Sequence, residues 1–309
     1  MLPEPLNARY VALNCLSETP RATLVLVEGR RDGRRRIVKL TPMDRRPDPR
    51  AWEQLRRRRP IDGLVFPLEQ GTTRDGRFYC VLPYYPDADL ASRLTQRALG
   101  AEDCLEFVRQ IQPVLEWLDE GSEQGVLIHG DIKPSNLLVE ESSDGVLRFL
   151  LGDFDTLRVH SANVRVHRYT PRYAAPETLA GSSSASADYW SLGMVVLEWL
   201  NGSHPFANLD NEAVRRLVAT DWTPVLDGIE DSAWRALLGG LLERNPSTRW
   251  RHLELGRWLA RDASVMAEGV GARGRDLGGT PVQGWRSALP HVTGARAGNA
   301  ETLAHRRAR

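Results

Sequence analysis

The stretch LIHGDIKPSNLL, residues 127–138, places an aspartate, a lysine and an asparagine within six residues, directly after an apolar run. The chain has 41 Lys and Arg residues, and only two of them are lysines: Lys133 in this stretch and Lys39 in RRRIVKL. Lysine is a compact point charge on a flexible stem, whereas arginine is a wide planar fork. These two exceptions to the arginine bias therefore single out positions where we expect a compact charge to matter.

A second acidic motif, LLGDFDTL (150–157), follows a strand-like apolar run. One carboxylate at Asp131, the amide of Asn136 and a second carboxylate at Asp153 are groups that can hold Mg²⁺ and position a nucleophile. A lysine between them, Lys133, can neutralise a phosphoryl group during its transfer. Because phosphoryl transfer is catalysed chiefly by positioning and charge stabilisation, the pattern favours that chemistry.

Taken in order, the motifs resemble those of the eukaryotic-type (Hanks-type) Ser/Thr protein kinases, in the bacterial branch of that family. The resemblance covers residues 6–261. HGDIKPSN is similar to the catalytic loop, DFD to the magnesium motif, and RIVK, which ends in Lys39, to the third strand and its lysine. Three further segments resemble the end of the activation segment, the helix beneath the catalytic loop and a structural arginine motif: YTPRYAAPE (169–177), DYWSLG (188–193) and RNPSTRW (244–250).

The resemblance implies catalytic and metal-binding roles for the residues of these motifs. Asp131 would accept or orient the proton of the attacking hydroxyl, and Lys133 would contact the γ-phosphate. Thr170 resembles the threonine that marks Ser/Thr specificity. ATP would be the phosphoryl donor, with Mg²⁺ or Mn²⁺ held by Asn136 and Asp153.

A second implied set of residues would hold the nucleotide. Lys39 would grip the α- and β-phosphates, with Glu53 as its helix partner. Leu82 would be the gatekeeper, and the backbone of Pro83 and Tyr85 would meet adenine. Proline has no N–H but keeps its C=O, which suits a hinge position that needs only an acceptor.

Two structural contacts are also implied. Arg249 is expected to pair with Glu177, and Asp188 is expected to bond to the backbone of the catalytic loop. Both would hold the site in shape without taking part in the chemistry.

The periodicity of the chain changes near residue 86. Before it, short runs rich in β-branched and apolar residues alternate with turn signals at Asp32-Gly33 and Asp75-Gly76, which is typical of antiparallel strands. One helix is predicted in this part, over 48–59. Beyond it the pattern is helical, with later helices predicted at 186–201, 210–219, 230–243 and 250–260.

We therefore predict an α+β, bilobal protein-kinase-like fold. Its N-lobe, residues 6–84, would be a small antiparallel sheet with one helix. Its C-lobe, residues 85–261, would be mainly α-helical. Residues 262–309, rich in Gly, Ala and Arg, are predicted to be a disordered tail.

The sequence departs from the family pattern in three places. Ser17, Thr19 and Ala22 stand where the phosphate-binding loop has glycines, whose backbone can approach phosphates closely; the hydroxyls could partly substitute. Asp155 replaces the glycine of the magnesium motif, which adds a negative charge near the metal. Gly130 replaces the arginine that usually reads a phosphorylated activation segment, so we expect activity without that phosphorylation.

Composition narrows the location and the partners. A net charge of +1 gives no general attraction to nucleic acid or membrane, and three widely spaced cysteines suggest a reducing cytosol without disulfides. The first ten residues do not resemble a signal peptide. Residues 1–60 carry fifteen Lys and Arg against seven Asp and Glu, which fits either a solvated surface or a docking patch for an acidic partner. We expect a cytoplasmic protein whose substrate is another protein.

Two other functions are compatible with the sequence. The altered glycine loop and Asp155 would also suit a pseudokinase, which is a binding or scaffold module. HGD followed by DFD resembles motifs of small-molecule kinases such as aminoglycoside or choline kinases. Those families lack a counterpart of Lys133 and of the APE and DYWSLG segments, however. The sequence names neither the substrate nor the activating signal nor the oligomeric state.

Overall fold

The computed structural model describes residues 2–87, 89–96, 99–120, 125–160, 166–220 and 222–261. The predicted tail, 262–309, lies outside the described residues. Within them, no helix is both long enough and apolar enough to cross a bilayer. The three cysteines are free thiols; Cys15 is exposed, and Cys80 and Cys104 are buried.

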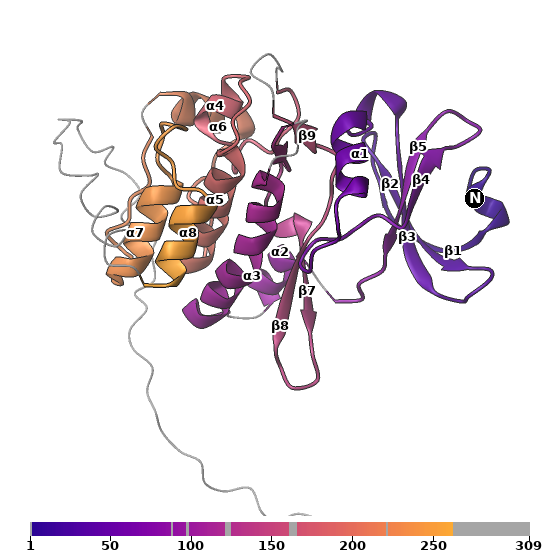
Figure 1. Ribbon diagram of the computed structural model, residues 1–309, viewed down its shortest axis with the longest axis horizontal. Coiled ribbons are helices and arrows are strands. Elements are labelled where there is room, and N and C mark those ends of the chain that lie inside the picture. The colour runs from indigo at the N-terminus through magenta and orange to yellow at the C-terminus, as the bar shows by residue number, and fades with distance from the viewer. Residues whose placement is uncertain are drawn as a thin grey trace, which may run out of the picture. The chain divides into compact units, whose positions relative to one another are not determined.

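The N-lobe is an antiparallel sheet with the strand order β1-β2-β3-β5-β4 (Figure 1). The strands are β1 Tyr10–Glu18, β2 Thr23–Gly29, β3 Arg35–Thr41, β4 Glu69–Thr72 and β5 Phe78–Pro83. The predicted turns lie between β2 and β3 and between β4 and β5, where Gly33 and Gly76 have φ of 65° and 82°. These positive values explain why each aspartate is followed by glycine at these turns.

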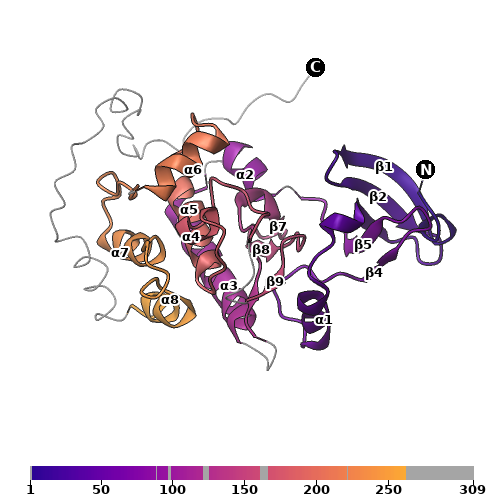
Figure 2. The same cartoon turned by 90° about the horizontal axis from the view of Figure 1, so that it is seen from above.

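Helix α1, Pro49–Arg57, is the single N-lobe helix that the sequence predicts. Asp48 caps it by accepting a hydrogen bond from the Arg50 N–H at 2.9 Å, and Pro49 occupies the first turn. Its buried face includes Trp52 and Leu55. Figures 1 and 2 show α1 between the sheet and the helical part, where it contacts β9.

The C-lobe is mainly helical, as predicted. Its helices are α2 Leu90–Gln96, α3 Ala101–Asp119, α4 Pro176–Leu179, α5 Ala187–Asn201, α6 Asn211–Ala219, α7 Ser232–Leu241 and α8 His252–Leu259. Its short strands pair as β6 Leu127–Ile128 with β9 Arg158–Val159, and β7 Leu137–Glu141 with β8 Leu147–Leu151. Short 3₁₀ turns occur at Leu6–Ala8, Met43–Arg45 and Pro134–Asn136.

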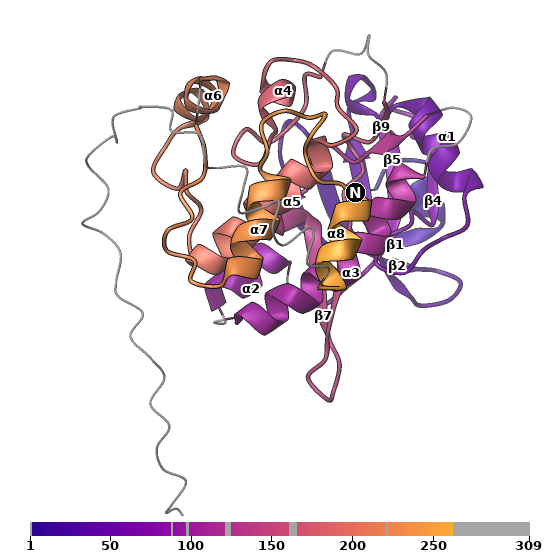
Figure 3. The ribbon, with the colours of Figure 1, turned by 60° about the vertical axis from the view of Figure 1, so that its left-hand side comes forward.

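Helix α5 is the central helix of the C-lobe core. It is buried on nearly every face, from Ala187 to Trp199, which explains its apolar sequence without a clear polar stripe. Helices α3 and α7 pack against it, and α8 lies beside both of these (Figure 3). The Tyr189 hydroxyl on α5 donates to Asp119 at the end of α3, and Arg251 donates to the same carboxylate at 2.7 Å. This buried network fixes the end of α3 against α5 and α8.

The predicted pair between Glu177 and Arg249 is confirmed. Two guanidinium N–H groups donate to the two carboxylate oxygens at 2.6 and 2.9 Å, and the Arg249 side chain is 0% exposed. Arg249 also donates to the carbonyls of Glu243 and Ser186. The pair therefore holds α4, at the end of the activation segment, to the start of α5 and the end of α7.

Buried His204 makes stability depend on pH. Its Nδ1 accepts from the Phe206 N–H at 3.0 Å, and burial, assisted by the nearby Arg172, lowers its pKa to about 4. The unfolded chain binds this proton near pH 6.5. We expect the free energy of unfolding to fall, by up to about 1.4 kcal/mol per pH unit, as pH drops from about 6.5 to about 4. Urea titrations of wild type and His204→Asn, which keeps an acceptor but does not titrate, would measure this; parallel pH dependences would contradict it.

Candidate active site

The loop that carries Asp131 is fixed on three sides. The carboxylate of Asp188 accepts the N–H of His129 at 2.7 Å and that of Gly130 at 2.8 Å, which confirms the contact expected from the sequence. The Thr156 hydroxyl donates to the His129 carbonyl at 2.7 Å. The His129 ring donates from Nε2 to the Gly152 carbonyl at 2.9 Å. Backbone and side chain are thus both held just before Asp131.

Asp131, Lys133, Asn136 and Thr170 come together around one carboxylate. The Lys133 ammonium donates to Asp131 Oδ2 at 2.6 Å and to Thr170 Oγ1 at 2.9 Å, and the Thr170 N–H donates to Asp131 Oδ1 at 3.0 Å. Asn136 Nδ2 donates to the Asp131 carbonyl at 2.8 Å. The Asp131 and Lys133 side chains are 13% and 22% exposed. A base and a cation therefore lie side by side at a partly open site.

Lys39 lies between two carboxylates. Its ammonium is 2.6 Å from Asp153 Oδ1 and 2.8 Å from Asp155 Oδ2. Burial alone would lower the pKa of Lys39, but attraction to the two carboxylates outweighs it and raises that pKa. The pKa of Asp155 is raised by burial and by the neighbouring negative charge of Asp153. Asp153 itself has φ of 62°, an uncommon backbone conformation for a residue other than glycine and one found at functional sites.

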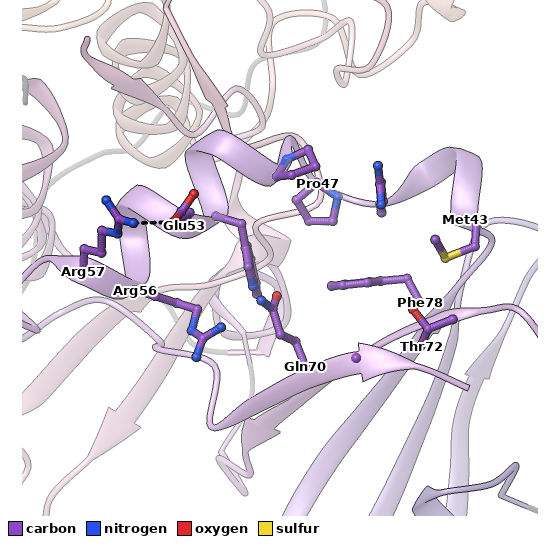
Figure 4. Close-up of a pocket in the computed structure, with 12 residues that line it drawn as sticks. Met43, Pro47, Glu53, Arg56, Arg57, Gln70, Thr72 and Phe78 are labelled. Atoms are coloured by element: carbon purple, nitrogen blue, oxygen red, sulfur yellow. Dashed lines mark hydrogen bonds and ion pairs between the residues drawn. The ribbon is translucent and has the colours of Figure 1, made fainter. Parts of the chain in front are cut away.

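The expected ion pair between Lys39 and Glu53 is not formed. Glu53 bonds instead to Arg57, one turn along α1, at 2.6 Å, as Figure 4 shows, and its side chain is 58% exposed. Lys39 is already bound by Asp153 and Asp155. An exposed pair of this spacing contributes only about 0.3–0.5 kcal/mol. Breaking the pair between Glu53 and Arg57 would therefore cost little free energy.

Asp155 competes for Lys39 with any phosphate that this lysine would bind. Removing the negative charge of this carboxylate, which would repel bound phosphates, should make the binding free energy of the nucleotide more favourable by on the order of 1 kcal/mol at a partly exposed site. We expect Asp155→Asn and Asp155→Gly each to bind Mg-ATP about fivefold more tightly than wild type, by calorimetric titration. If only Asp155→Gly bound Mg-ATP more tightly, the cause would be backbone flexibility, which would contradict the charge explanation.

Asn136 and Asp153 fit the donor chemistry of a Mg²⁺ site. Asn136 Nδ2 faces Asp131, which leaves its Oδ1 as an acceptor, and the Gly152 N–H donates to the Asn136 carbonyl at 2.9 Å, tying the two segments together. Mg²⁺ is commonly bound by one or two protein oxygens together with substrate phosphates. The described residues contain no cluster of three or more His, Cys, Asp or Glu that could hold a metal by themselves.

The turn between β1 and β2 is closed by a side chain. Thr19 Oγ1 accepts the N–H groups of Arg21 at 3.2 Å and Ala22 at 3.1 Å, and the Thr19 N–H donates to the Ala22 carbonyl. The sequence suggested that this hydroxyl could replace missing glycines at a phosphate. In the structure this hydroxyl oxygen accepts the N–H groups of its own turn, so these two backbone donors are already bonded.

The residues expected at the adenine end lie on and after β5. Leu82 pairs with Ile37 and Pro83 with Arg36 across β3, two or three residues from the pair formed by Lys39 and Cys80. Tyr85 follows the end of the strand, and burial raises its pKa. These residues therefore lie at the end of β5, the strand that pairs with β3 beside Lys39.

Two basic residues near the site were not singled out from the sequence. Arg158, on β9, is only 7% exposed and lies against Gly130. Arg168 donates to the Arg45 carbonyl at 2.8 Å, linking the activation segment to the turn before α1. The glycine at position 130 was the feature of the sequence that could have pointed to Arg158. A glycine in place of the usual arginine leaves space that another large side chain can fill. No local signal marks Arg168 among the many arginines.

The sequence is similar to known proteins over more than half of its length. A family model described as "Protein kinase domain" matches residues 65–257. The chain is similar to Serine/threonine-protein kinase SSK22 of Saccharomyces cerevisiae, 33% identical over 202 residues, covering 56% of this chain and 14% of that protein. It is also similar to Ribosomal protein S6 kinase alpha-1 of Homo sapiens, 29% identical over 190 residues (60% and 25%), and to Serine/threonine-protein kinase gad8 of Schizosaccharomyces pombe, 28% over 196 residues (60% and 32%). The chain thus spans less than a third of each of these relatives.

Proposed function

This chain belongs to the protein kinase domain family, and we propose that it transfers the γ-phosphoryl group of ATP to Ser or Thr hydroxyls of a protein substrate. The observation that carries the proposal is the cluster in which Lys133 bonds to both Asp131 and Thr170. It puts a proton acceptor, a cation and the threonine associated with Ser/Thr specificity around one partly open point.

In the proposed reaction, the substrate hydroxyl lies beside Asp131 and gives its proton to that carboxylate. The hydroxyl oxygen forms the new bond to phosphorus while the bond from phosphorus to the bridging oxygen of ADP breaks. Lys133 stabilises the charge on the transferring group, and Lys39 holds the remaining phosphates. Asn136 and Asp153 would hold Mg²⁺ or Mn²⁺, which when bound supplies positive charge to the phosphates.

The first test is incubation with labelled ATP. We expect incorporation into the chain itself or into a generic basic substrate when Mg²⁺ or Mn²⁺ is present. No transfer with either metal, from protein that folds cooperatively, would overturn the proposed activity. Transfer to a hydroxylated small molecule and not to protein would instead support the small-molecule kinase alternative, which no described contact favours.

A pseudokinase is the second candidate, and two contacts favour it. Thr19 closes the turn that would cradle phosphates, and Asp155 holds Lys39. A thermal-shift titration separates the two candidates, because a ligand that binds the folded state raises the melting temperature by mass action. Stabilisation by Mg-ATP together with transfer supports the kinase; stabilisation without transfer supports a nucleotide-binding scaffold.

We also propose that the basic N-lobe docks an acidic partner peptide at the pocket beside α1. This pocket, of about 640 Å³, is lined by apolar side chains that include Met43, Trp52 and Phe78. Figure 4 shows Met43 and Phe78 at one end and Arg56 and Arg57 at the other. The lining contains three arginines and one glutamate, which suits a negatively charged occupant.

Two buried polar atoms in the pocket lining support the same proposal. Among the described residues, Trp52 Nε1 and Gln70 Oε1 have no hydrogen-bond partner, and a peptide backbone that reached them would supply an acceptor and a donor. We expect an acidic peptide with a central Phe to bind more tightly than its Ala counterpart. Binding should weaken with Arg56→Glu but not with Arg257→Glu, an exposed arginine on α8. If both variants lost the same peptide affinity, the peptide would be held by general charge attraction and not by this pocket.

Several finer assignments remain predictions. The lobe limits, 6–84 and 85–261, are supported by β5 ending at Pro83 and α8 at Leu259. Cytoplasmic location is supported by the three free thiols. Membership of the bacterial branch rests on the sequence motifs, and the relatives named above are all eukaryotic.

A further inference from the structure

In the catalytic loop, the space beside Gly130 is occupied by a side chain from another segment, that of Arg158. A methyl group built on Gly130 would lie 2.0 Å from Nη1 and 3.1 Å from Cζ of Arg158. Gly130 also has φ of 79°, which disfavours other residues. Arg158 reaches this place because β9 pairs with β6, which puts Arg158 opposite Ile128, two residues before Gly130. The guanidinium therefore occupies the place of a side chain at position 130.

Arg158 is buried at a cost to stability. It is 7% exposed, and among the described residues no carboxylate lies within ion-pair distance of it. Within the part of the chain that the structure describes, its Nε and Nη2 have no hydrogen-bond partner, and the one contact of Nη1 is a long one, 3.4 Å, to the Thr156 carbonyl. Buried unpaired charges and donors are destabilising. These contacts give the arginine little stabilisation to offset its burial.

The guanidinium of Arg158 lies against Gly130, whose N–H donates to Asp188, so its charge is close to the residue that holds the loop. Asp188 is 4% exposed, and burial raises its pKa, while the positive charge of Arg158 and the N–H groups that the carboxylate accepts oppose that rise. Attraction to Asp188 likewise opposes the effect of burial on Arg158. As an ionised acceptor, Asp188 binds the N–H groups of both His129 and Gly130, immediately before Asp131. Arg158 is thus placed to stabilise this arrangement by packing and by charge.

We propose that Arg158 is a positioning residue for Asp131: its guanidinium packs in the space beside Gly130, and its charge keeps Asp188 bonded to the catalytic-loop backbone. This inference rests on the proposed kinase activity. Because the positive charge is built into the chain, the loop reaches its working geometry without a phosphate on the activation segment.

The first experiment compares Arg158→Met with Arg158→Lys at saturating Mg-ATP. Methionine fills similar volume without charge, so we expect kcat to fall about 100-fold, the scale of a misplaced catalytic group, with KM for ATP unchanged. Lysine keeps the charge and should recover most of the rate. Wild-type kcat in Arg158→Met, or equal losses in both variants, would overturn the role of the charge. Phosphatase treatment should leave wild-type activity unchanged; loss that rephosphorylation restores would mean that Arg158 reads a phosphate.

The second experiment does not need activity, so it separates failure of this inference from failure of the proposed function. Melting temperatures are measured for Gly130→Ala, Arg158→Ala and the double variant. Backbone strain at Gly130 is the same in both backgrounds, but the collision with the guanidinium exists only with Arg158 present. We expect Gly130→Ala to lower the melting temperature much less in the Arg158→Ala background. Equal losses in the two backgrounds would overturn the packing.

Discussion

Replacing Asp131 with asparagine is expected to lower kcat by about 10²–10⁴-fold, the range typical of losing a general base. Asn keeps an oxygen that can accept the Thr170 N–H, which Asp131 Oδ1 accepts at 3.0 Å. Its amide NH₂ would face the Lys133 ammonium, which now donates to Oδ2 at 2.6 Å, so two donors would oppose each other. The variant loses both the proton acceptor and the orientation of the lysine.

Initial rates of phosphoryl transfer at saturating Mg-ATP measure this effect. A thermal shift with Mg-ATP serves as the control for folding and nucleotide binding, and it should persist because Lys39 and Asp153 are untouched. Asp227→Asn, at an exposed aspartate, is the matched substitution and should keep the wild-type rate. If Asp131→Asn transferred phosphate as fast as wild type, the assignment of the catalytic base would be wrong.

Local signals were sufficient to predict most of the fold. The Asp-Gly pairs at residues 32–33 and 75–76 require positive φ at the glycine and so fix two hairpins. Asp48 and Pro49 set the start of α1 within a residue. Asp131, Lys133 and Asn136 are close in sequence, so one short loop brings them together, and only Thr170 had to arrive from elsewhere.

The contacts that the sequence could not predict are those that depend on how distant segments are placed. Glu53 bonds to Arg57 on its own helix and not to Lys39, and no local pattern in the sequence decides between these two partners. Lys39 is drawn to Asp155, which is distant in sequence, and that contact depends on how the segment after Asp153 turns. Arg158 illustrates the same limit, because its position follows from the pairing of β9 with β6.

The largest expected change in stability comes from Arg249→Met. This substitution leaves the Glu177 carboxylate, 12% exposed, without its two guanidinium donors and removes donors from the carbonyls of Glu243 and Ser186. Breaking a buried pair by removing one partner costs about 3–5 kcal/mol, because the remaining charge stays desolvated. Urea denaturation measures this as a fall in the midpoint at constant slope.

We expect this loss because the pair is buried, and not because its N–O distance is short. Arg216→Met tests that explanation. Arg216 pairs with Glu212 at 2.6 Å, the same distance as Arg249 with Glu177, but its side chain is 69% exposed. An exposed pair is worth at most about 1 kcal/mol. The double variant Glu177→Leu with Arg249→Met should recover part of the loss, since no unpaired charge then remains buried. Equal losses for Arg249→Met and Arg216→Met, or no recovery in the double variant, would show that desolvation of the unpaired carboxylate is not what destabilises the fold.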